Sequence, residues 1–287
     1  MNALRDPQTW VLNFSCPDRA GIVHAVTGGV AAGAGNILEL QQFSSQDTGR
    51  FFMRVEFESP LSRELLERAL TPTVDGFHAE WSLVSTERPT RVLVLASKAG
   101  HCLNHLLFRQ RSGQLNIEIP QILANHPDLG DLAAFYGVPF EHQPVSPQTK
   151  PAFEARVRQI VEDEQIELVV LARYMQILSP ELCDFLAGRA INIHHSFLPG
   201  FKGANPYRQA HARGVKVIGA TAHFVTSDLD EGPIIEQNVV RVDHSQGPSA
   251  LMALGQDEES RTLTEAVKLF AEHRVFTDGQ RTIIFRG

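Results

Sequence analysis

The sequence predicts an α/β protein of two domains, in which a small βαββαβ unit precedes an open, mostly parallel sheet. A chain of 287 residues is long enough for two domains of roughly 150 residues each. Apolar and polar residues alternate before residue 86, whereas residues 92–96 and 168–172 are unbroken apolar runs, typical of parallel strands buried on both faces. The polar, proline-containing segment 85–90 separates the two patterns. We therefore expect domains over residues 1–86 and 87–287.

Composition narrows the class of protein. Hydrophobic residues make up 43% of the chain and charged residues 21%, which excludes disorder, collagen and a coiled coil. A net charge of −7 argues against a nucleic-acid-binding protein, and no apolar run approaches the ~20 residues that span a bilayer. The start of the chain does not read as a secretion signal, and the three scattered cysteines do not form a disulfide framework. We expect a cytoplasmic protein.

The first domain should contain four strands and two helices. In chain order we expect a strand at 10–15, a helix that carries Val23, Val26 and Val30, strands at 36–40 and 51–57, a helix at 62–70 and a strand at 79–83. Asp18 is the expected N-cap of the first helix, which should end near Gly33. A sheet this small has one face without helices. Because that face needs cover, we expect a homo-oligomer.

In the second domain the strands alternate with helices. Helices are expected at 102–111, 128–136, 151–164 and 249–272. Strands are expected at 215–225 and 233–240, which could pair with each other, and a last strand at 282–285. A βαβα pattern implies a parallel sheet whose site lies at the carboxyl ends of its strands.

Asn192 and His194 stand at such a strand end. Residues two apart on a strand project to the same face, and a loop rich in proline and glycine follows them. A carboxamide can hold a developing oxyanion and an imidazole can hold or move a proton, a combination that suits carbonyl chemistry. The residues alone leave an alternative open, in which Asn192 ends the strand and His194 binds the loop.

The turn after the strand at 215–225 carries two carboxylates, Asp228 and Asp230. Either could act as a general base or orient His194, or could be a solvated turn residue. His223 is expected to be a core histidine bonded to the backbone. His101 and His105 lie one helical turn apart, but without further ligands nearby in sequence we expect no metal site. Phosphate-binding glycine motifs and the GxSxG nucleophile motif are absent.

Two long motifs carry a family resemblance. AsnIleHisHisSerPheLeuPro and HisPheValThrSerAspLeuAspGluGlyProIleIle resemble the signatures of the folate-dependent formyltransferase superfamily. CysProAspArgAlaGlyIleVal and GlyAsnIle, in the first 85 residues, resemble an ACT domain, a small amino-acid-sensing module. The combination resembles the formyltetrahydrofolate deformylase family. It implies a ferredoxin-like ACT domain followed by a Rossmann-like formyltransferase domain.

The resemblance also implies site residues. Asn192, His194 and Asp230 match the catalytic Asn-His-Asp set of the superfamily. The loop that holds the folate pterin corresponds to Arg173, Tyr174, Met175, Gln176, Ile177 and Leu178. Two departures distinguish this chain from the glycinamide ribonucleotide formyltransferases: segment 97–104 lacks their phosphate-cradling turn, and His195 stands where they usually have proline. Segment 255–260 also departs from the family pattern, with an expected effect on a peripheral contact.

The implied activity is hydrolysis of 10-formyltetrahydrofolate to tetrahydrofolate and formate, which supplies formate for purine synthesis and balances the folate pool. No metal or cofactor is expected. The alternatives are a formyltransferase using the same donor and a catalytically silent amino-acid sensor. Glycine and methionine are the implied effectors, held by Asp18, Gly21 and Asn36. Gly21 is expected to allow close approach of the chain, or else to serve only the turn.

Overall fold

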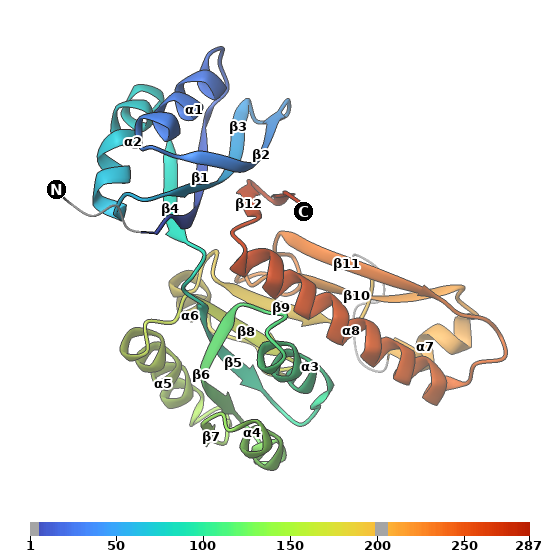
Figure 1. Ribbon diagram of the computed structural model, residues 1–287. Coiled ribbons are helices and arrows are strands. Elements are labelled where there is room, and N and C mark those ends of the chain that lie inside the picture. The colour runs from blue at the N-terminus through green and yellow to red at the C-terminus, as the bar shows by residue number, and fades with distance from the viewer. Residues whose placement is uncertain (1–5, 199–205) are drawn as a thin grey trace. The chain divides into compact units, whose positions relative to one another are not determined.

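The computed structural model describes residues 6–198 and 206–287, and the chain divides into two compact units (Figure 1). The first unit contains the chain up to Pro89 together with Glu272–Asp278 and Ile283–Gly287. The second contains Thr90–Ala271 and Gly279–Thr282. The sequence division assigned everything after residue 86 to one domain, whereas the structure groups two C-terminal segments with the first unit.

The first unit has the predicted βαββαβ order. Its elements are β1 (Gln8–Pro17), α1 (Ile22–Ala32), β2 (Asn36–Ser45), β3 (Arg50–Ser59), α2 (Arg63–Phe77) and β4 (Glu80–Ser85). The strands form one sheet in the order β2-β3-β1-β4, with every neighbouring pair antiparallel. Both helices cover one face (Figure 1), where Phe14, Val55 and Leu66 belong to a single buried apolar cluster. The ACT-like fold is confirmed.

The C-terminal segment of the chain packs on the other face of this sheet. Phe276, in β12 (Val275–Asp278), meets the Phe52 ring edge to face at 5.8 Å. Asn13 Nδ2 donates a hydrogen bond to the His273 carbonyl oxygen at 3.0 Å, and buried Arg54 donates to that of Glu272 at 3.2 Å. This face therefore finds part of its cover within the chain, but Phe43, opposite Phe52 in the sheet, stays 45% exposed, and association with another subunit stays a prediction.

The predicted N-cap of α1 is wrong. The helix starts one turn of chain later than Asp18, with Gly21 at the N-cap position in the left-handed conformation at φ 93°. The Asp18 amide instead donates to the Gly49 carbonyl oxygen at 2.8 Å, which ties the β1–α1 connection to the β2–β3 turn. A side-chain cap was expected because aspartate favours that position, but the tertiary hydrogen bond holds Asp18 elsewhere.

The second unit is the larger α/β layer structure. Its elements are β5 (Thr90–Ala96), α3 (His101–Arg111), β6 (Ile117–Ala124), α4 (Gly130–Tyr136), β7 (Phe140–His142), α5 (Lys150–Asp163), β8 (Leu168–Ala172), α6 (Pro180–Phe185), β9 (Ala190–His194), α7 (Pro206–Arg213), β10 (Val217–Phe224), β11 (Ile234–Arg241) and α8 (Pro248–Ala271). The last strand, β13 (Arg281–Ile284), pairs with β12 in a separate two-stranded sheet.

Seven strands form the main sheet in the order β11-β10-β9-β8-β5-β6-β7. The five strands from β9 to β7 run parallel, and β10 and β11 are antiparallel to their neighbours. Apolar side chains of α5 and α6 form one buried cluster with alternate residues of β5 and β8. On the other face α8 packs against α3 and β10 (Figure 1). The predicted open, mostly parallel fold is confirmed.

The connections locate the site. From β5 the chain adds β6 and β7 on one side, and then returns to add β8 and β9 on the other. Such a reversal of strand order opens a crevice at the carboxyl ends of the strands, where α/β proteins bind their ligands. Among the helices of the described residues, none is both long enough and apolar enough to cross a membrane.

Candidate active site

Asn192 and His194 lie at the carboxyl end of β9, as the sequence predicted. In the antiparallel pair of β9 and β10, Asn192 stands opposite His223, so the two side chains share a face of the sheet. Asn192 Nδ2 lies 3.3 Å from His223 Nε2. The loop that follows β9 includes residues 199–205, which lie outside the described residues.

Asp230, in the β10–β11 turn, reaches both histidines. Its Oδ2 is 3.2 Å from His194 Nδ1, and its Oδ1 is 3.6 Å from His223 Nε2. The hydrogen bond from His194, followed by that from His223, holds the pKa of Asp230 far below its usual value despite partial burial. The structure therefore brings the three predicted catalytic residues together, around an ionised carboxylate.

His194 directs a free nitrogen into the site. An ionised carboxylate only accepts hydrogen bonds, so His194 Nδ1 donates to Asp230 and Nε2 is the atom left for chemistry. That Nε2 is buried and has no hydrogen-bond partner among the described residues. A buried polar atom without a partner is costly, which marks it as a contact point for a ligand.

His223 is a site residue that the sequence reasoning missed. Its Nδ1 contacts the Phe224 carbonyl oxygen at 2.8 Å, as expected for a core histidine, but its Nε2 faces Asn192 and Asp230. The signal was available in the sequence. If the predicted 215–225 strand pairs beside Asn192, an imidazole on its inner face reaches the same strand end.

The catalytic set and the predicted folate loop line one cavity of about 380 Å³. Met175, Gln176 and Ile177 are exposed at its edge, and the Met175 amide donates to Ser97 Oγ at 3.0 Å. Tyr174 and Leu178 point into the apolar core instead, with Tyr174 stacked on Phe153 at 5.5 Å. Arg173 contacts His195 and Glu259. The loop thus offers its backbone and a few exposed side chains to the cavity.

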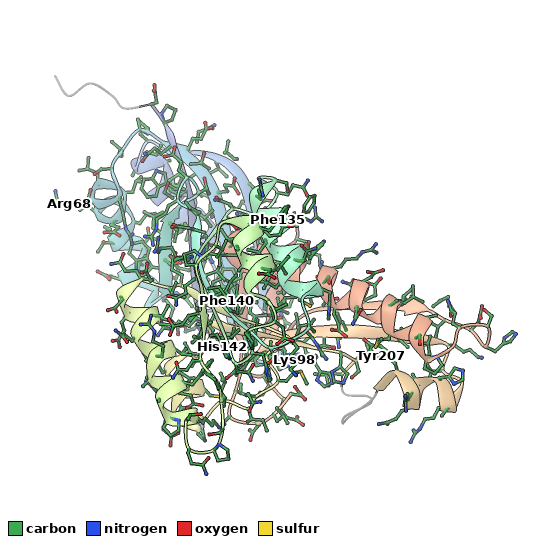
Figure 2. All side chains as sticks on the ribbon, turned by 90° about the horizontal axis from the view of Figure 1, so that it is seen from below. Arg68, Lys98, Phe135, Phe140, His142 and Tyr207 are labelled. Atoms are coloured by element: carbon green, nitrogen blue, oxygen red, sulfur yellow. The ribbon has the colours of Figure 1, made fainter. Side chains whose placement is uncertain are left out.

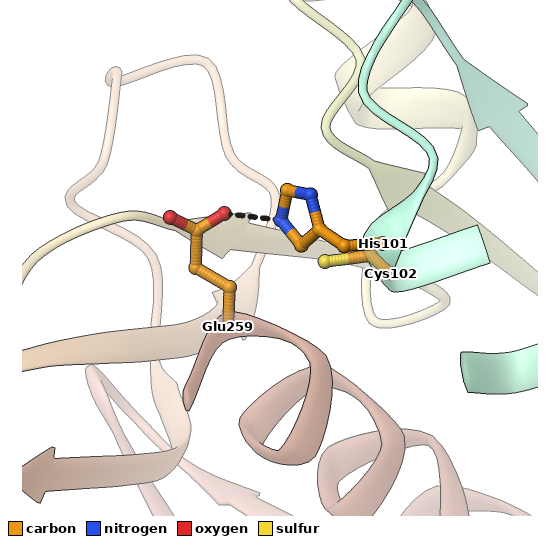
Figure 3. Close-up of side chains that lie close together, drawn as sticks. All are labelled: His101, Cys102 and Glu259. Atoms are coloured by element: carbon orange, nitrogen blue, oxygen red, sulfur yellow. Dashed lines mark hydrogen bonds and ion pairs between the residues drawn. The ribbon is translucent and has the colours of Figure 1, made fainter. Parts of the chain in front are cut away.

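A second polar cluster surrounds Glu259 on α8, and Figure 3 shows it beside His101 and Cys102. Glu259 Oε2 lies 2.7 Å from His101 Nε2, and Oε1 accepts a hydrogen bond from the Tyr207 hydroxyl at 2.6 Å. His105 contacts Thr264 at 2.7 Å instead, so the two histidines do not share a partner. Within segment 255–260, Glu259 is 1% exposed and central to this cluster, and the effect of the segment's departure from the family pattern stays a prediction.

His101, Cys102 and Glu259 could in principle hold a metal ion, since their ligand atoms lie within 4.8 Å of one another. The surrounding charge opposes it. Arg173 Nε is 3.3 Å from Glu259 Oε2 and already balances the carboxylate. Burial, reinforced by Glu259, raises the pKa of the Cys102 thiol far above its usual value and disfavours the thiolate that a metal needs. This donor set fits a hydrogen-bonded cluster better than a cation site.

The proposed effector residues lie in the first unit. Asp18, Gly21 and Asn36 are all exposed. A Cβ at Gly21 would meet no described atom within 4 Å, so no neighbouring part of the described chain requires glycine there. What glycine provides is the left-handed backbone that starts α1. The turn role is thus supported, and a ligand role stays a prediction.

Two known protein families and several named relatives match this chain, and the relatives match it over almost its whole length. The formyl transferase family matches residues 90–267 and the ACT domain family residues 10–71. A formyltetrahydrofolate deformylase from Corynebacterium sp. (strain P-1) is 48% identical, covering 96% of this chain and 98% of the relative. The Escherichia coli (strain K12) relative of the same name is 38% identical, with the same coverage.

Solved structures agree. The crystal structure of a formyltetrahydrofolate deformylase from Burkholderia mallei ATCC 23344 matches with a TM-score of 0.94 and 51% identity, over 98% of this chain and 100% of that one. A glycinamide ribonucleotide transformylase from Symbiobacterium toebii matches with a TM-score of 0.65 and 33% identity, over 71% of this chain and 98% of that one. Because the first set of relatives spans both units while the transformylase spans less of the chain, this protein belongs to the formyltetrahydrofolate deformylase family.

Proposed function

We propose that this protein hydrolyses 10-formyltetrahydrofolate to tetrahydrofolate and formate, with water as the acceptor of the formyl group. One observation carries the proposal: Asn192, His194 and Asp230 converge in the cavity that the 173–178 loop also lines. Relatives named for this activity match along almost the whole chain. The site would then lower the barrier by polarising one carbonyl and moving one proton.

Asn192 and His194 have roles set by their donor atoms. Asn192 Nδ2 and the free Nε2 of a protonated His194 would donate hydrogen bonds to the formyl oxygen, whose negative charge grows as water attacks the carbon. Positioned donors of this kind are each worth about 10²–10³-fold in rate.

Asp230 holds His194 in that orientation and orients the attacking water. Attack by water forms a C–O bond, and breaking the bond from the formyl carbon to N10 releases formate. The proton given up by water passes to N10, which leaves as the amine of tetrahydrofolate. Asp230 stays ionised because its pKa is depressed, so its charge stabilises a protonated His194 and it can accept a hydrogen bond from the attacking water, which orients that water. We propose that no metal or cofactor takes part.

The test is formate release from 10-formyltetrahydrofolate by the purified chain, with no amine acceptor present. We expect steady turnover to formate and tetrahydrofolate. Turnover that starts only when an amine acceptor is added would support the formyltransferase alternative. No turnover in either condition would support a catalytically silent sensor.

We propose further that the first unit senses amino acids, with glycine and methionine as opposing effectors. The match to the ACT domain family supports a sensing role. The Asp18 amide already donates to the Gly49 carbonyl oxygen, so the other amide groups of the Asp18–Gly21 turn would hold the ligand carboxylate, and Asn36 would lie near its amine. We propose that subunits associate through the edge strand β2, because its Leu38 and Phe43 are exposed. Light scattering, which gives the mass of the particle in solution, tests this association.

We also propose that the protein lies in the cytoplasm, which its three free cysteines support.

A further inference from the structure

Two cavities meet at Arg173, Met175 and His195, which line both of them. One is the catalytic cavity described above. The other, which we call the neighbouring cavity, measures about 440 Å³ and is also lined by His101, Tyr207 and Glu259. Side chains that line both cavities form the boundary between them. What holds this boundary in place therefore decides what can pass to the formyl carbon.

Arg173 is the centre of the boundary. Its Nη1 lies 3.0 Å from His195 Nδ1 and its Nε 3.3 Å from Glu259 Oε2, and its side chain is only 18% exposed. The backbone of Arg173 adopts φ 60°, a left-handed conformation that is strained for a residue other than glycine. Strain of this kind persists only where surrounding contacts fix it, and the two contacts of the guanidinium do so.

Glu259 anchors the guanidinium from the far side. Three helices hold this carboxylate, since His101 comes from α3, Tyr207 from α7 and Glu259 itself from α8 (Figure 2 labels Tyr207). Burial raises the pKa of Glu259, but the His101 hydrogen bond, the Arg173 charge and the Tyr207 hydrogen bond together bring the pKa below its usual value. The anchor is therefore a charged, fully engaged carboxylate.

His195 extends the boundary as far as His194, the proposed catalytic histidine. Its ring stacks on the His194 ring, with centroids 4.7 Å apart and planes 19° from parallel. Because a guanidinium only donates, His195 Nδ1 must accept from Arg173, which makes His195 neutral. A neutral ring can lie flat against a protonated His194 without repelling its charge.

We propose that Glu259, Arg173 and His195 form a partition that selects water as the formyl acceptor by closing the catalytic cavity to amines in the neighbouring cavity. The proposal rests on the proposed function and adds the residues that determine acceptor specificity. A water molecule needs only about 10–15 Å³ of free space, so a boundary that excludes an amine with its substituent still admits water.

The experiment measures which acceptor takes the formyl group. The chain is given 10-formyltetrahydrofolate and glycinamide, and formate and N-formylglycinamide are quantified together. In the transfer reaction the glycinamide nitrogen forms a bond to the formyl carbon, the bond from that carbon to N10 breaks, and the amine proton goes to N10. Tetrahydrofolate is the product of both routes. Reactions without protein give the uncatalysed background.

Arg173→Ala and His195→Ala should each raise the ratio of N-formylglycinamide to formate at least about tenfold over the parent, the scale of a single pocket contact. Glu259→Gln keeps the shape of the anchor without its charge and should raise the ratio less. Arg208→Ala is the matched control, because it removes an exposed arginine that lines only the neighbouring cavity. It should keep the ratio of the parent. Adding Asp230→Asn to Arg173→Ala should remove both products.

A ratio of products from one enzyme does not depend on the fraction that is folded, so modest destabilisation leaves the test valid. His195→Ala is the second variant should Arg173→Ala fail to fold. An unchanged ratio in folded, formate-releasing variants would overturn the partition. So would loss of both products in well-folded variants, since the residues would then serve the chemistry itself. Absence of formate release by the parent would instead overturn the proposed function.

Discussion

At Asp230, a single carboxylate faces two imidazole rings. His194 and His223 approach from different strands, β9 and β10, so the carboxylate fixes the relative position of two elements as well as the tautomer of His194. Its own backbone is held at φ 58°, outside the region that aspartate usually adopts. This strained backbone conformation places the Asp230 side chain in the cavity.

Asp230→Asn should lower turnover by at least ~10²-fold, the usual scale for a positioned acid–base group. Folate binding should change little, because we propose that the 173–178 loop, and not Asp230, holds the folate. Steady-state formate release measures the first effect and a fluorescence titration with tetrahydrofolate the second. Asp228→Asn is the control, since Asp228 lines the same cavity. Near-normal turnover in Asp230→Asn, with a large loss in Asp228→Asn, would reassign the role.

The candidate catalytic residues could be predicted because they lie in contiguous motifs next to strand ends. Asn192 and His194 share one strand end, and Asp230 follows a strand within one turn. Glu259 could not be assigned in this way, because its partners His101, Arg173 and Tyr207 are more than 50 residues away. The one local signal was a carboxylate on the buried face of α8, four residues from buried Gly255 and Leu263.

At the scale of elements, the β10–β11 turn is fixed by a close backbone contact. A Cβ on Gly232 would lie 1.8 Å from the Phe224 carbonyl oxygen, and the Phe224 amide donates to the Pro233 carbonyl oxygen at 2.9 Å. Any side chain at position 232 must therefore push the two strand ends apart. Asp230 lies two residues before Gly232, so a shift of the backbone at Gly232 would also move the Asp230 side chain in the proposed catalytic site.

Gly232→Ala should lower both stability and turnover. Forcing a methyl group into a packed site costs about 1–3 kcal/mol, and the shift should move Asp230 away from His194. Thermal unfolding and formate release measure the two effects. Gly247→Ala is the control, because a Cβ there would meet nothing within 4 Å. Wild-type turnover in Gly232→Ala would show that the turn does not set the position of Asp230.

Strand β7, at the edge of the sheet, is tied to α5 by an ion pair. Phe140 and His142 flank Glu141 in this strand (Figure 2), and Glu141 Oε2 lies 2.8 Å from Arg156 Nη2. The Arg156 hydrogen bond lowers the pKa of Glu141, burial opposes the change, and Gln121 adds a further hydrogen bond. The unfolded chain therefore takes up this proton at higher pH than the folded protein does.

Glu141→Gln should lower the free energy of unfolding at pH 7 by about 1 kcal/mol or less, because the pair is partly exposed. The difference from the parent should be fully present above the unfolded pKa of about 4.3, and should shrink as the pH falls through the depressed folded value. Urea unfolding at a series of pH values measures it. Glu162→Gln, an exposed change on α5, should show no such trend. A constant difference down to pH 3 would contradict the assignment.

Gly21→Val should abolish the response to glycine and methionine while leaving basal hydrolysis mostly intact. A branched residue strains the left-handed backbone at φ 93°, which disturbs the Asp18–Gly21 turn, and the proposed catalytic residues lie in the other unit. Formate release with and without each amino acid measures both effects. Gly28→Val, also on α1 and with open space for a side chain, should keep the response. An unchanged response in Gly21→Val would refute the effector site.

At the scale of the whole molecule, the order and type of most elements could be predicted from periodicity. Alternation in the first unit and continuous apolar runs such as 168–172 reflect sheets buried on one or both faces. The return of residues 272–278 to the first unit could not be predicted. It depends on long-range pairs such as Arg54 with Glu272 and Phe52 with Phe276, for which local pattern carries no signal.

The central claim is that water takes the formyl group at the site formed by Asn192, His194 and Asp230. The most direct measurement is formate release from 10-formyltetrahydrofolate in H₂¹⁸O without an added amine, comparing the parent with Asp230→Asn. The account predicts steady formation of formate carrying one ¹⁸O per turnover in the parent, and at least ~10²-fold slower formation in the variant. Formate release that requires an amine acceptor, or that proceeds at the parental rate in Asp230→Asn, would contradict it.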